Sequence, residues 1–302
     1  MKRVVFEAVI DGIVMDRIIR DDSFSMPTMH FHEEYEIYYL LEGARYYFIE
    51  NKTYRINKGS LVLINSSQIH RTSMFEKTPH DRVLIEVTAE PFNHFFESVC
   101  GLSLSQFFAE HAGVFELGEN AQGIVRNLLF SMMDEFSRQQ PRYEKIVMMK
   151  LAELLLNVAS FKADKRIFYN SAMSQAPKHL KIDEIAEYIQ TNFNKVKSLD
   201  EISKKFFVSK GYLCRIFKEV TGFTVQDYIN VHRIQKAQEL LDASNMNIAE
   251  IAASLGYNSL TNFERLFHKY TETSPLKYRK KMRMIRQKVR ERKLEKKQPE
   301  SS

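Results

Sequence analysis

The sequence predicts an α+β chain of two domains, with a β-barrel and helices in the N-terminal half and only helices in the C-terminal half. Three observations support this. Short runs of β-branched and aromatic residues, separated by turn residues, fill positions 1–90. After residue 91 the apolar residues recur with a helical period. In the last third of the chain, one pattern of two short helices occurs twice.

Five strands and three helices are predicted in the N-terminal half. The strands lie at 35–41, 45–49, 53–56, 61–64 and 82–88, and the helices at 91–99, 121–136 and 142–160. The helix at 142–160 is apolar almost all round, so it needs cover on more than one side. The barrel of its own chain accounts for one side. A second subunit, or another element of the same monomer, accounts for the other.

Composition changes divide the chain into four parts. We predict a β-rich domain with helices at 1–162, a linker at 163–179, a helical domain at 180–281 and a basic tail at 282–302. The linker is assigned because 161–179 mixes polar residues and proline without a sustained period.

Charge is distributed unevenly along the 302 residues, which carry a net charge of +6. Residues 1–177 contain 19 Lys and Arg against 23 Asp and Glu, whereas 178–302 contain 25 against 15. The asymmetry predicts that only the C-terminal half meets a polyanion.

The cysteine content and the hydropathy pattern predict a cytoplasmic protein. Only Cys100 and Cys214 are present, which excludes a disulfide scaffold. Glu7 and Asp11 interrupt the apolar start of the chain before a signal peptide can form. No stretch reaches the roughly 18 apolar residues that a bilayer span requires, so no membrane partner is expected.

The repeated pattern in the C-terminal half predicts two helix-turn-helix units joined by a long helix at 225–242. Ile202 corresponds to Ile251 and Phe217 to Phe267, and the offset grows from 49 to 50 residues through one inserted residue. The predicted helix caps are Ser198, Ser209, Asn247 and Ser259. Two such units on one chain predict a protein that reads two successive major grooves of DNA.

The second helix of each unit presents a polar stripe, because its apolar residues point into the core. Arg and Asn pair with guanine and adenine edges, while Lys, Ser and Thr suit phosphates. The DNA-binding candidates on the two stripes are Lys210, Gly211, Tyr212, Cys214 and Arg215, and then Leu260, Thr261, Asn262, Glu264 and Arg265.

With these residues, positions 180–281 resemble the DNA-binding domain of the AraC/XylS family of bacterial transcription regulators. The matching stretches are Tyr212-Leu213-Cys214-Arg215-Ile216-Phe217-Lys218, Ile248-Ala249-Glu250-Ile251-Ala252 and Phe263-Glu264-Arg265-Leu266-Phe267. The resemblance implies sequence-specific binding to double-stranded promoter DNA. Two positions depart from the family pattern. Glu272 replaces the usual glycine after the last recognition helix, which predicts an unusual C-cap. Gly211 and Cys214 have short side chains, so Arg215 is expected to make most of the base contacts of the first recognition helix.

The N-terminal half contains a histidine pattern that resembles the first motif of a cupin barrel: His30-Phe31-His32, then Glu36 and Gly43. His70 follows where the second motif would place its histidine. The four residues His30, His32, Glu36 and His70 match a divalent-metal set in type and spacing. The other interpretations are an effector pocket and structural hydrogen bonds. Tyr38, Arg45 and Tyr47 complete the effector-binding candidates, and alternation does not decide which strand face points inward.

The family resemblance further implies that 1–162 senses a small-molecule effector, for which a sugar is one candidate, and forms a homodimer. It also implies that the protein, when bound as an activator, contacts RNA polymerase. Activation and repression both remain open from the sequence. The resemblance implies neither an enzyme nor a resident cofactor. Two alternatives remain open from sequence. One is a metal-dependent cupin enzyme fused to a DNA-binding domain. The other is a nonspecific nucleic-acid binder that relies on the basic tail.

Overall fold

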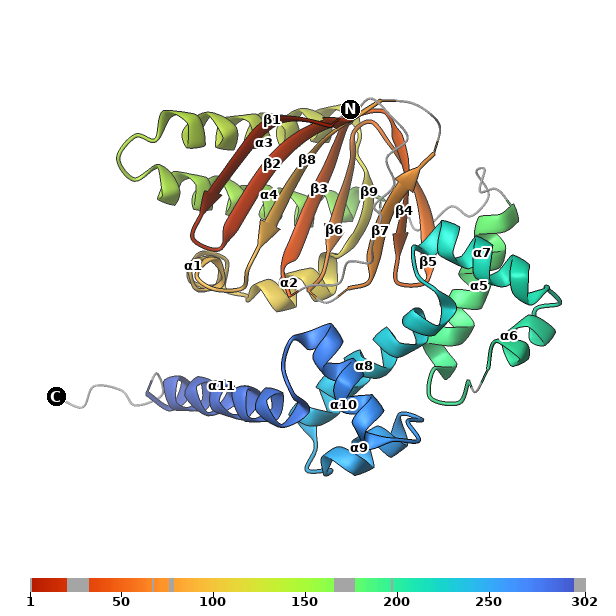
Figure 1. Cartoon of the computed structure of the whole chain (residues 1–302). Coiled ribbons are helices and arrows are strands. Elements are labelled where there is room, and N and C mark those ends of the chain that lie inside the picture. The colour runs from red at the N-terminus through yellow and green to blue at the C-terminus, as the bar shows by residue number, and fades with distance from the viewer. Residues whose placement is uncertain are drawn as a thin grey trace. The chain divides into compact units, whose positions relative to one another are not determined.

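The computed structural model describes residues 2–20, 33–66, 68–75, 79–165, 177–196 and 198–295. The chain forms two compact units. The first contains Met1–Asp183 and Val220–Gly222, and the second contains Glu184–Glu219 and Phe223–Ser302. The first unit has the strands, and the second is built from helices (Figure 1).

Nine antiparallel strands of the first unit form two sheets. The larger sheet has the order β1-β2-β8-β3-β6-β9 and the smaller has the order β5-β4-β7. The strands are β1 (Lys2–Ile10), β2 (Ile13–Arg20), β3 (Tyr35–Glu42), β4 (Ala44–Ile49), β5 (Lys52–Asn57), β6 (Ser60–Ile64), β7 (His70–Met74), β8 (His80–Val87) and β9 (Gly113–Glu116).

The larger sheet is covered on both faces. On β3, Ile37 and Tyr39 belong to the core that packs under the helices, whereas Tyr38 and Leu40 belong to a second core with Tyr47 and Ile49 of β4. Successive side chains alternate between the faces of a strand, so one strand serves both cores. Because both faces are buried, aromatic residues stand side by side in the sequence at Tyr38-Tyr39 and Tyr46-Tyr47.

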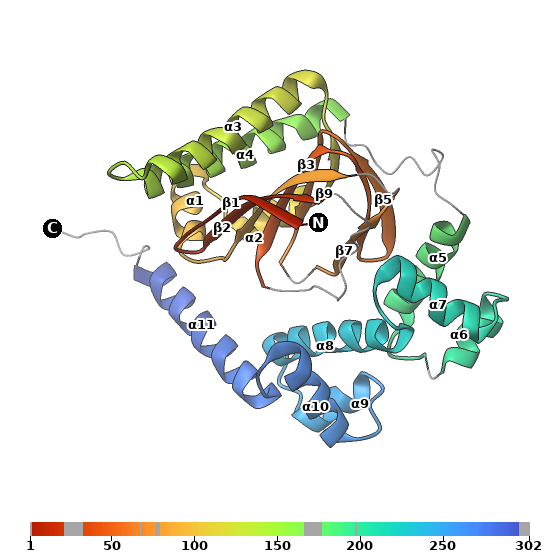
Figure 2. The ribbon, with the colours of Figure 1, turned by 45° about the horizontal axis from the view of Figure 1, so that its top comes forward.

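Four helices complete the first unit: α1 (Phe92–Cys100), α2 (Leu104–His111), α3 (Glu119–Arg138) and α4 (Tyr143–Lys165). α3 and α4 lie side by side, and Figure 2 shows them beside the sheet. Leu151, Leu154, Leu155 and Val158 of α4 are fully buried. The helix at 142–160 therefore finds cover within its own chain.

The described part of the second unit contains six helices and most of α5 (Pro177–Asn192), which runs across the division between the units. The six are α6 (Leu199–Lys205), α7 (Lys210–Thr221), α8 (Val225–Ala243), α9 (Ile248–Ser254), α10 (Leu260–Thr271) and α11 (Pro275–Glu295). Both predicted helix pairs are therefore present, with α8 between them. No helix of the described residues is long and apolar enough to cross a membrane.

The structure adds elements that the sequence patterns did not define, namely β1, β2, β7, β9 and α2. The strand predicted at 82–88 begins two residues earlier, and helix occupies both ends of the predicted linker, because α4 continues to Lys165 and α5 begins at Pro177. Residues 166–176 lie outside the described residues.

Candidate functional site

α7 and α10, the second helices of the two helix-turn-helix units, are called the reading helices below. The first of them, α7, carries the polar stripe that the sequence predicted. The Ser209 hydroxyl accepts a hydrogen bond from the Tyr212 backbone N–H at 3.2 Å and so caps the helix. Leu213, Ile216 and Phe217 are buried, while Lys210, Gly211, Cys214 and Arg215 are exposed and Tyr212 is half-buried. Exposed ion pairs hold two cations of this surface: Lys210 Nζ lies 2.5 Å from Asp200 Oδ1, and Arg215 lies 3.9 Å from Glu219. Exposed pairs of this kind contribute about 0–1 kcal/mol, so DNA can displace them.

The second reading helix, α10, repeats the arrangement. Ser259 caps it, and Phe263, Leu266 and Phe267 are buried. The five candidates Leu260, Thr261, Asn262, Glu264 and Arg265 are all exposed. Arg265 donates a hydrogen bond to Asn262 Oδ1 at 3.0 Å, so the two side chains that suit base edges lie next to each other.

Glu272 ends α10 in the left-handed conformation, with φ of 56°. This is the conformation that glycine adopts at no steric cost. The predicted unusual C-cap is therefore confirmed.

α8 connects the two reading helices and is buried along most of its length, including Tyr228, Val231 and Ile234. At 1.5 Å per residue its 19 residues span about 28 Å. α8 packs against α9, α10 and α11, and Tyr228 of α8 meets Phe217 of α7 edge to face with ring centroids 5.3 Å apart, so it contacts both helix-turn-helix units.

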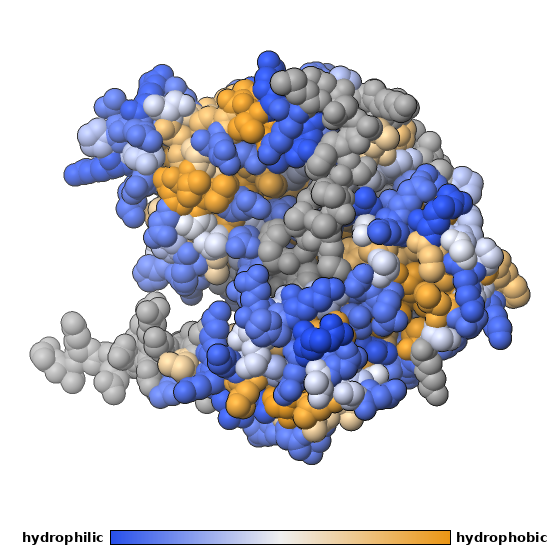
Figure 3. Space-filling model, viewed as in Figure 1, coloured by the Kyte–Doolittle hydropathy of each residue, from blue (hydrophilic) through white to orange (hydrophobic). Residues whose placement is uncertain are grey.

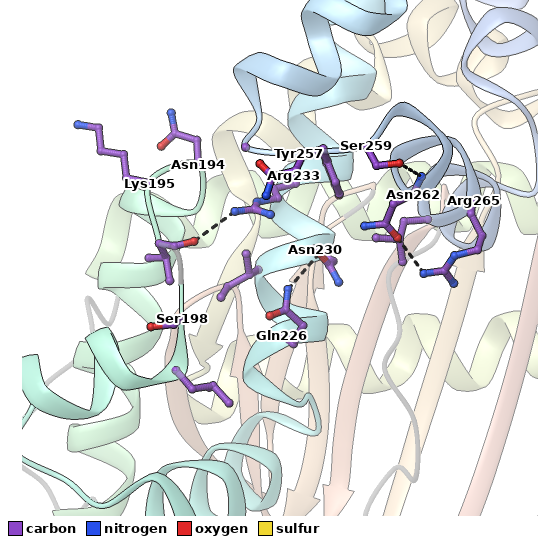
Figure 4. A pocket seen from close by; sticks show the side chains of 16 residues that line it. Asn194, Lys195, Ser198, Gln226, Asn230, Arg233, Tyr257, Ser259, Asn262 and Arg265 are labelled. Atoms are coloured by element: carbon purple, nitrogen blue, oxygen red, sulfur yellow. Dashed lines mark hydrogen bonds between the residues drawn. The ribbon is translucent and has the colours of Figure 1, made fainter.

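A cleft of about 950 Å³ opens between the two helix-turn-helix units and has α8 as its floor (Figure 4). One wall is the loop before α6, and the other is the turn between α9 and α10 with the start of α10. The described residues that line it include three cations, Lys195, Arg233 and Arg265, and no carboxylate. The cleft therefore offers positive charge and amide or hydroxyl donors, a combination that suits phosphates.

In the first unit, the structure brings together five of the seven effector-binding candidates. Glu36, Tyr38, Arg45, Tyr47 and His70 are all buried, and the register places them on strand faces that point between the two sheets. His30 and His32 lie outside the described residues. Tyr38 and Tyr47 meet edge to face with ring centroids 5.3 Å apart.

Glu36 and His70 form a close pair in this interior. His70 Nε2 lies 3.1 Å from Glu36 Oε1, and His70 Nδ1 lies 2.8 Å from the Gln68 carbonyl oxygen. A carbonyl only accepts, so Nδ1 carries a hydrogen, and the Glu36–His70 contact must hold one more proton. Glu36 and His70 therefore form a hydrogen-bonded polar pair in the buried interior.

The surroundings of these groups disfavour charge. Burial raises the pKa of Tyr47, and the neighbouring Glu36 carboxylate raises it further. Burial also raises the pKa of Tyr38, and it lowers the pKa of Arg45, against which the nearby Tyr38 acts. Both phenols therefore stay neutral donors, and Arg45 is a cation held at a desolvation cost.

Sequence reasoning missed two polar residues of the same interior, Arg82 and Glu86. Both share a face of β8 with Leu84, which packs against the core between the sheets. Arg82 forms an ion pair with Asp16, and burial lowers its pKa to about 10. The signal was the alternation of Arg82 and Glu86 with Val83 and Ile85, which normally indicates a solvent face; here the polar face points into the barrel.

Within the described residues no three His, Cys, Asp or Glu side chains gather as metal ligands. Of the proposed metal set, the structure describes only Glu36 and His70. The metal interpretation therefore remains a hypothesis.

Known proteins share both parts of the chain. Residues 202–281 match a family model of a helix-turn-helix domain, and residues 13–74 match an AraC-like ligand binding domain. The melibiose operon regulatory protein of Escherichia coli (strain K12) is 23% identical over 277 residues, which cover 87% of this chain and 86% of that protein. The Msm operon regulatory protein of Streptococcus mutans is 30% identical over 101 residues, covering 33% of this chain and 36% of that protein.

Among solved structures, ToxT from Vibrio cholerae O395 is 13% identical, with 89% of this chain and 98% of that chain covered and a TM-score of 0.36.

These matches fall on the two features that the geometry singled out, the polar barrel interior and the paired reading helices. The chain therefore combines an AraC-like ligand binding domain with a helix-turn-helix DNA-binding domain, as AraC-type transcription regulators do.

Proposed function

We propose that α7 and α10 enter two adjacent major grooves of promoter DNA from the same side of the duplex. The single observation that carries this proposal is the repeated exposed stripe on both helices, ending in Arg215 and Arg265, with a buried helix of about 28 Å between them. Successive major grooves on one side of B-DNA are about 34 Å apart.

The cleft supports the same orientation. It lies between the reading helices, and the described residues lining it carry no negative charge. We infer that the sugar-phosphate backbone between the two grooves lies along it, with Lys195, Ser198 and Asn258 as contacts in addition to the base-reading residues.

Selection of bound fragments from genomic or random DNA, followed by footprinting, tests the proposal. The parent protein should protect two boxes about one helical turn apart. Arg215→Ala should relax base preference in one box and Arg265→Ala in the other, each with a loss of about 5- to 150-fold in affinity.

Lys236→Ala is the matched control, because Lys236 is an exposed cation of α8 that pairs with Glu239 and lies outside both stripes. Undiminished binding of both arginine variants to the selected site would show that the reading helices are wrongly assigned.

We propose further that the barrel interior binds a small polar effector, with a sugar as the first candidate. Hydrogen-bonding groups beside aromatic rings suit a polyhydroxyl ligand, and Glu36, Arg45 and Tyr47 supply both. The name of the relative regulating a melibiose operon points to the same class of compound. A thermal-shift screen of sugars against the parent and Glu36→Gln tests this. A sugar that stabilises both equally would not bind through Glu36.

We infer that the protein acts as a homodimer through α3 and α4. The side chains of Ile124 and Phe130 on α3, and of Met149 and Leu156 on α4, are exposed although apolar. Figure 3 also shows apolar side chains over β1, the edge strand, where Val9 is exposed. Sedimentation of the variant with Met149→Lys and Leu156→Lys should show monomers, and an unchanged dimer would exclude these helices.

We infer that the bound regulator acts in the cytoplasm and contacts RNA polymerase, and that it is not an enzyme. The naming of its relatives as regulators supports the last point. We also propose that the sensing domain ends at residue 162, the linker at 179 and the DNA-binding domain at 281. The alternative of a metal-dependent cupin enzyme fused to a DNA-binding domain predicts stoichiometric divalent metal in purified protein. Elemental analysis of the parent and of the variant with His30→Ala and His32→Ala tests it.

A further inference from the structure

A buried arginine lies at the middle of α8, in a segment whose neighbours Val231 and Ile234 are fully buried. Only 9% of the surface of Arg233 is exposed. Its Nε donates a hydrogen bond to the Phe193 carbonyl oxygen at 3.0 Å, and Nη2 donates to the Val196 carbonyl oxygen at 3.3 Å. Figure 4 shows the side chain reaching from α8 to the loop that leads into α6. Arg233 thereby ties α8 to the first helix-turn-helix unit.

The same guanidinium also contacts the second helix-turn-helix unit. It lies 5.3 Å from the ring centroid of Tyr257, in the turn between α9 and α10. A cation over an aromatic ring contributes favourably, and more so where water is excluded. Arg233 is therefore in contact with the loop before one unit and the turn of the other.

Gly256 shows how close the two units come at this point. A Cβ atom added there would lie 2.8 Å from the Asn194 carbonyl oxygen and 3.1 Å from Arg233 Nη2. The loop before α6 and the turn before α10 thus meet around Arg233, with no space for another side chain.

Among the described residues that line the cleft, no carboxylate offsets the cost of burying this cation. Burial lowers the pKa of Arg233, and the charged groups among the cleft residues are all cations. In some proteins a buried charge that costs stability fixes one conformation among several.

We propose that Arg233 is a positioning residue that fixes the spacing and orientation of the two helix-turn-helix units, so that α7 and α10 enter both grooves at once. It acts through Phe193, Val196 and Tyr257 and does not contact DNA. This inference rests on the proposed two-groove binding.

The test uses the full-length protein and three DNA probes: the selected two-box site, the same site with two base pairs inserted between the boxes, and a site with one box replaced by random sequence. The parent should bind the first probe at least about tenfold more tightly than the second. Arg233→Met, which keeps the length of the side chain, should lose most of this discrimination and bind the one-box probe as the parent does.

Arg233→Lys keeps the charge but cannot bridge two carbonyls and a ring, so it should behave like Arg233→Met. Lys236→Ala removes a cation from the same helix and should retain the spacing preference of the parent. Circular dichroism at 222 nm verifies that each variant is folded, and the lysine variant provides the result if the methionine variant is not.

Four results would overturn the inference. Retained spacing discrimination in both arginine variants would show that the units are held by other contacts. An equal loss of affinity on all three probes, with a salt slope smaller by about one, would make Arg233 a phosphate contact instead. Full recovery by Arg233→Lys would reduce its role to charge alone. If the parent itself protects only one box, the two-groove proposal fails and the inference fails with it; if the parent protects two boxes, only the role of Arg233 is in question.

Discussion

Phe207 should destabilise the protein, and replacing it with glycine should stabilise it. Phe207 follows α6 with φ of 54°, in the turn that the repeat places opposite Gly256, whose φ is 80°. The hydrogen bonds correspond in the two copies: Val208 N–H donates to Ser203 O, and Tyr257 N–H donates to Ala252 O, each at 3.0 Å. The first helix-turn-helix unit therefore has a phenylalanine at the left-handed position where the second helix-turn-helix unit has a glycine.

The magnitude follows from the backbone, because the Phe207 side chain is 95% exposed and buries almost nothing. A left-handed conformation costs a non-glycine residue about 1–2 kcal/mol. Glycine returns about 0.5–1 kcal/mol of this through the entropy of the unfolded chain. Phe207→Gly should therefore raise the free energy of unfolding by about 0.5–1 kcal/mol, or a few degrees in the Tm of the DNA-binding unit.

Urea and thermal unfolding followed by circular dichroism measure this effect, since the chain has no Trp. Phe207→Ala is the matched control: it removes the ring and keeps the strained φ, so it should change stability little. Gly256→Ala should destabilise by about 2 kcal/mol, because a Cβ there meets the Asn194 carbonyl oxygen at 2.8 Å and φ is unfavourable as well. A gain from Phe207→Ala equal to that from Phe207→Gly would refute the argument, because it would place the cost in the side chain.

Three further results are expected. Burial lowers the pKa of His232 to about 4, so below about pH 6.5 the unfolded chain takes up a proton that the folded chain does not. The free energy of unfolding should therefore fall as the pH drops from 6.5 towards 4. His232→Gln should reduce this pH dependence, which urea titrations at pH 5 and 7 measure. Burial raises the pKa of Glu50 to about 7, so above about pH 4.5 the folded chain keeps a proton that the unfolded chain loses. The stability of the strand-containing unit should therefore fall as the pH rises from 4.5 through 7, and Glu50→Gln should abolish this pH dependence. A pH dependence that survives the substitution would show that another group causes it. Deleting residues 283–302 should weaken binding to specific and random DNA alike and reduce the salt slope, because the segment carries eight Lys and Arg; a lost preference between the two DNAs would instead support the nonspecific binder.

The DNA-binding candidates were predictable because the determinants of those helices are local. Ser209 and Ser259 cap their helices, and Asn247 with Glu250 forms the predicted type of cap before α9. The apolar spacing then fixes which residues face the core and which remain exposed. The role of each exposed residue in DNA binding stays a prediction.

The barrel interior was less predictable because the faces of its strands are decided by contacts distant in sequence. Tyr38 and Tyr39 are adjacent aromatics, and only the packing of a second sheet on one face and helices on the other separates them. Arg82 and Glu86 have the alternation of a solvent face, yet they lie inside the barrel. Local pattern does not distinguish a polar interior from a polar surface.

Arg233 was not predicted as functional because its partners come from both sides of α8. The carbonyl groups that it binds belong to residues about 40 positions away, and carbonyls leave no mark in a sequence. The indication that was present is a charge flanked by the apolar residues Val231 and Ile234 in the middle of the connecting helix.

The cost of Arg233 makes stability and function separable. Removing a buried charge is most costly where it leaves an opposite charge uncompensated, and none of the described residues that line the cleft gives Arg233 a carboxylate partner. The cleft beside Arg233 is large enough for water, so the carbonyl oxygens of Phe193 and Val196 can be rehydrated when the guanidinium is removed. Arg233→Met should therefore unfold at a temperature no lower than that of the parent by more than a few degrees while losing its preference for one spacing of the boxes. A variant that lost both in proportion would show that the arginine serves the fold, and that the geometry of reading is a consequence of stability rather than a separate property of this residue.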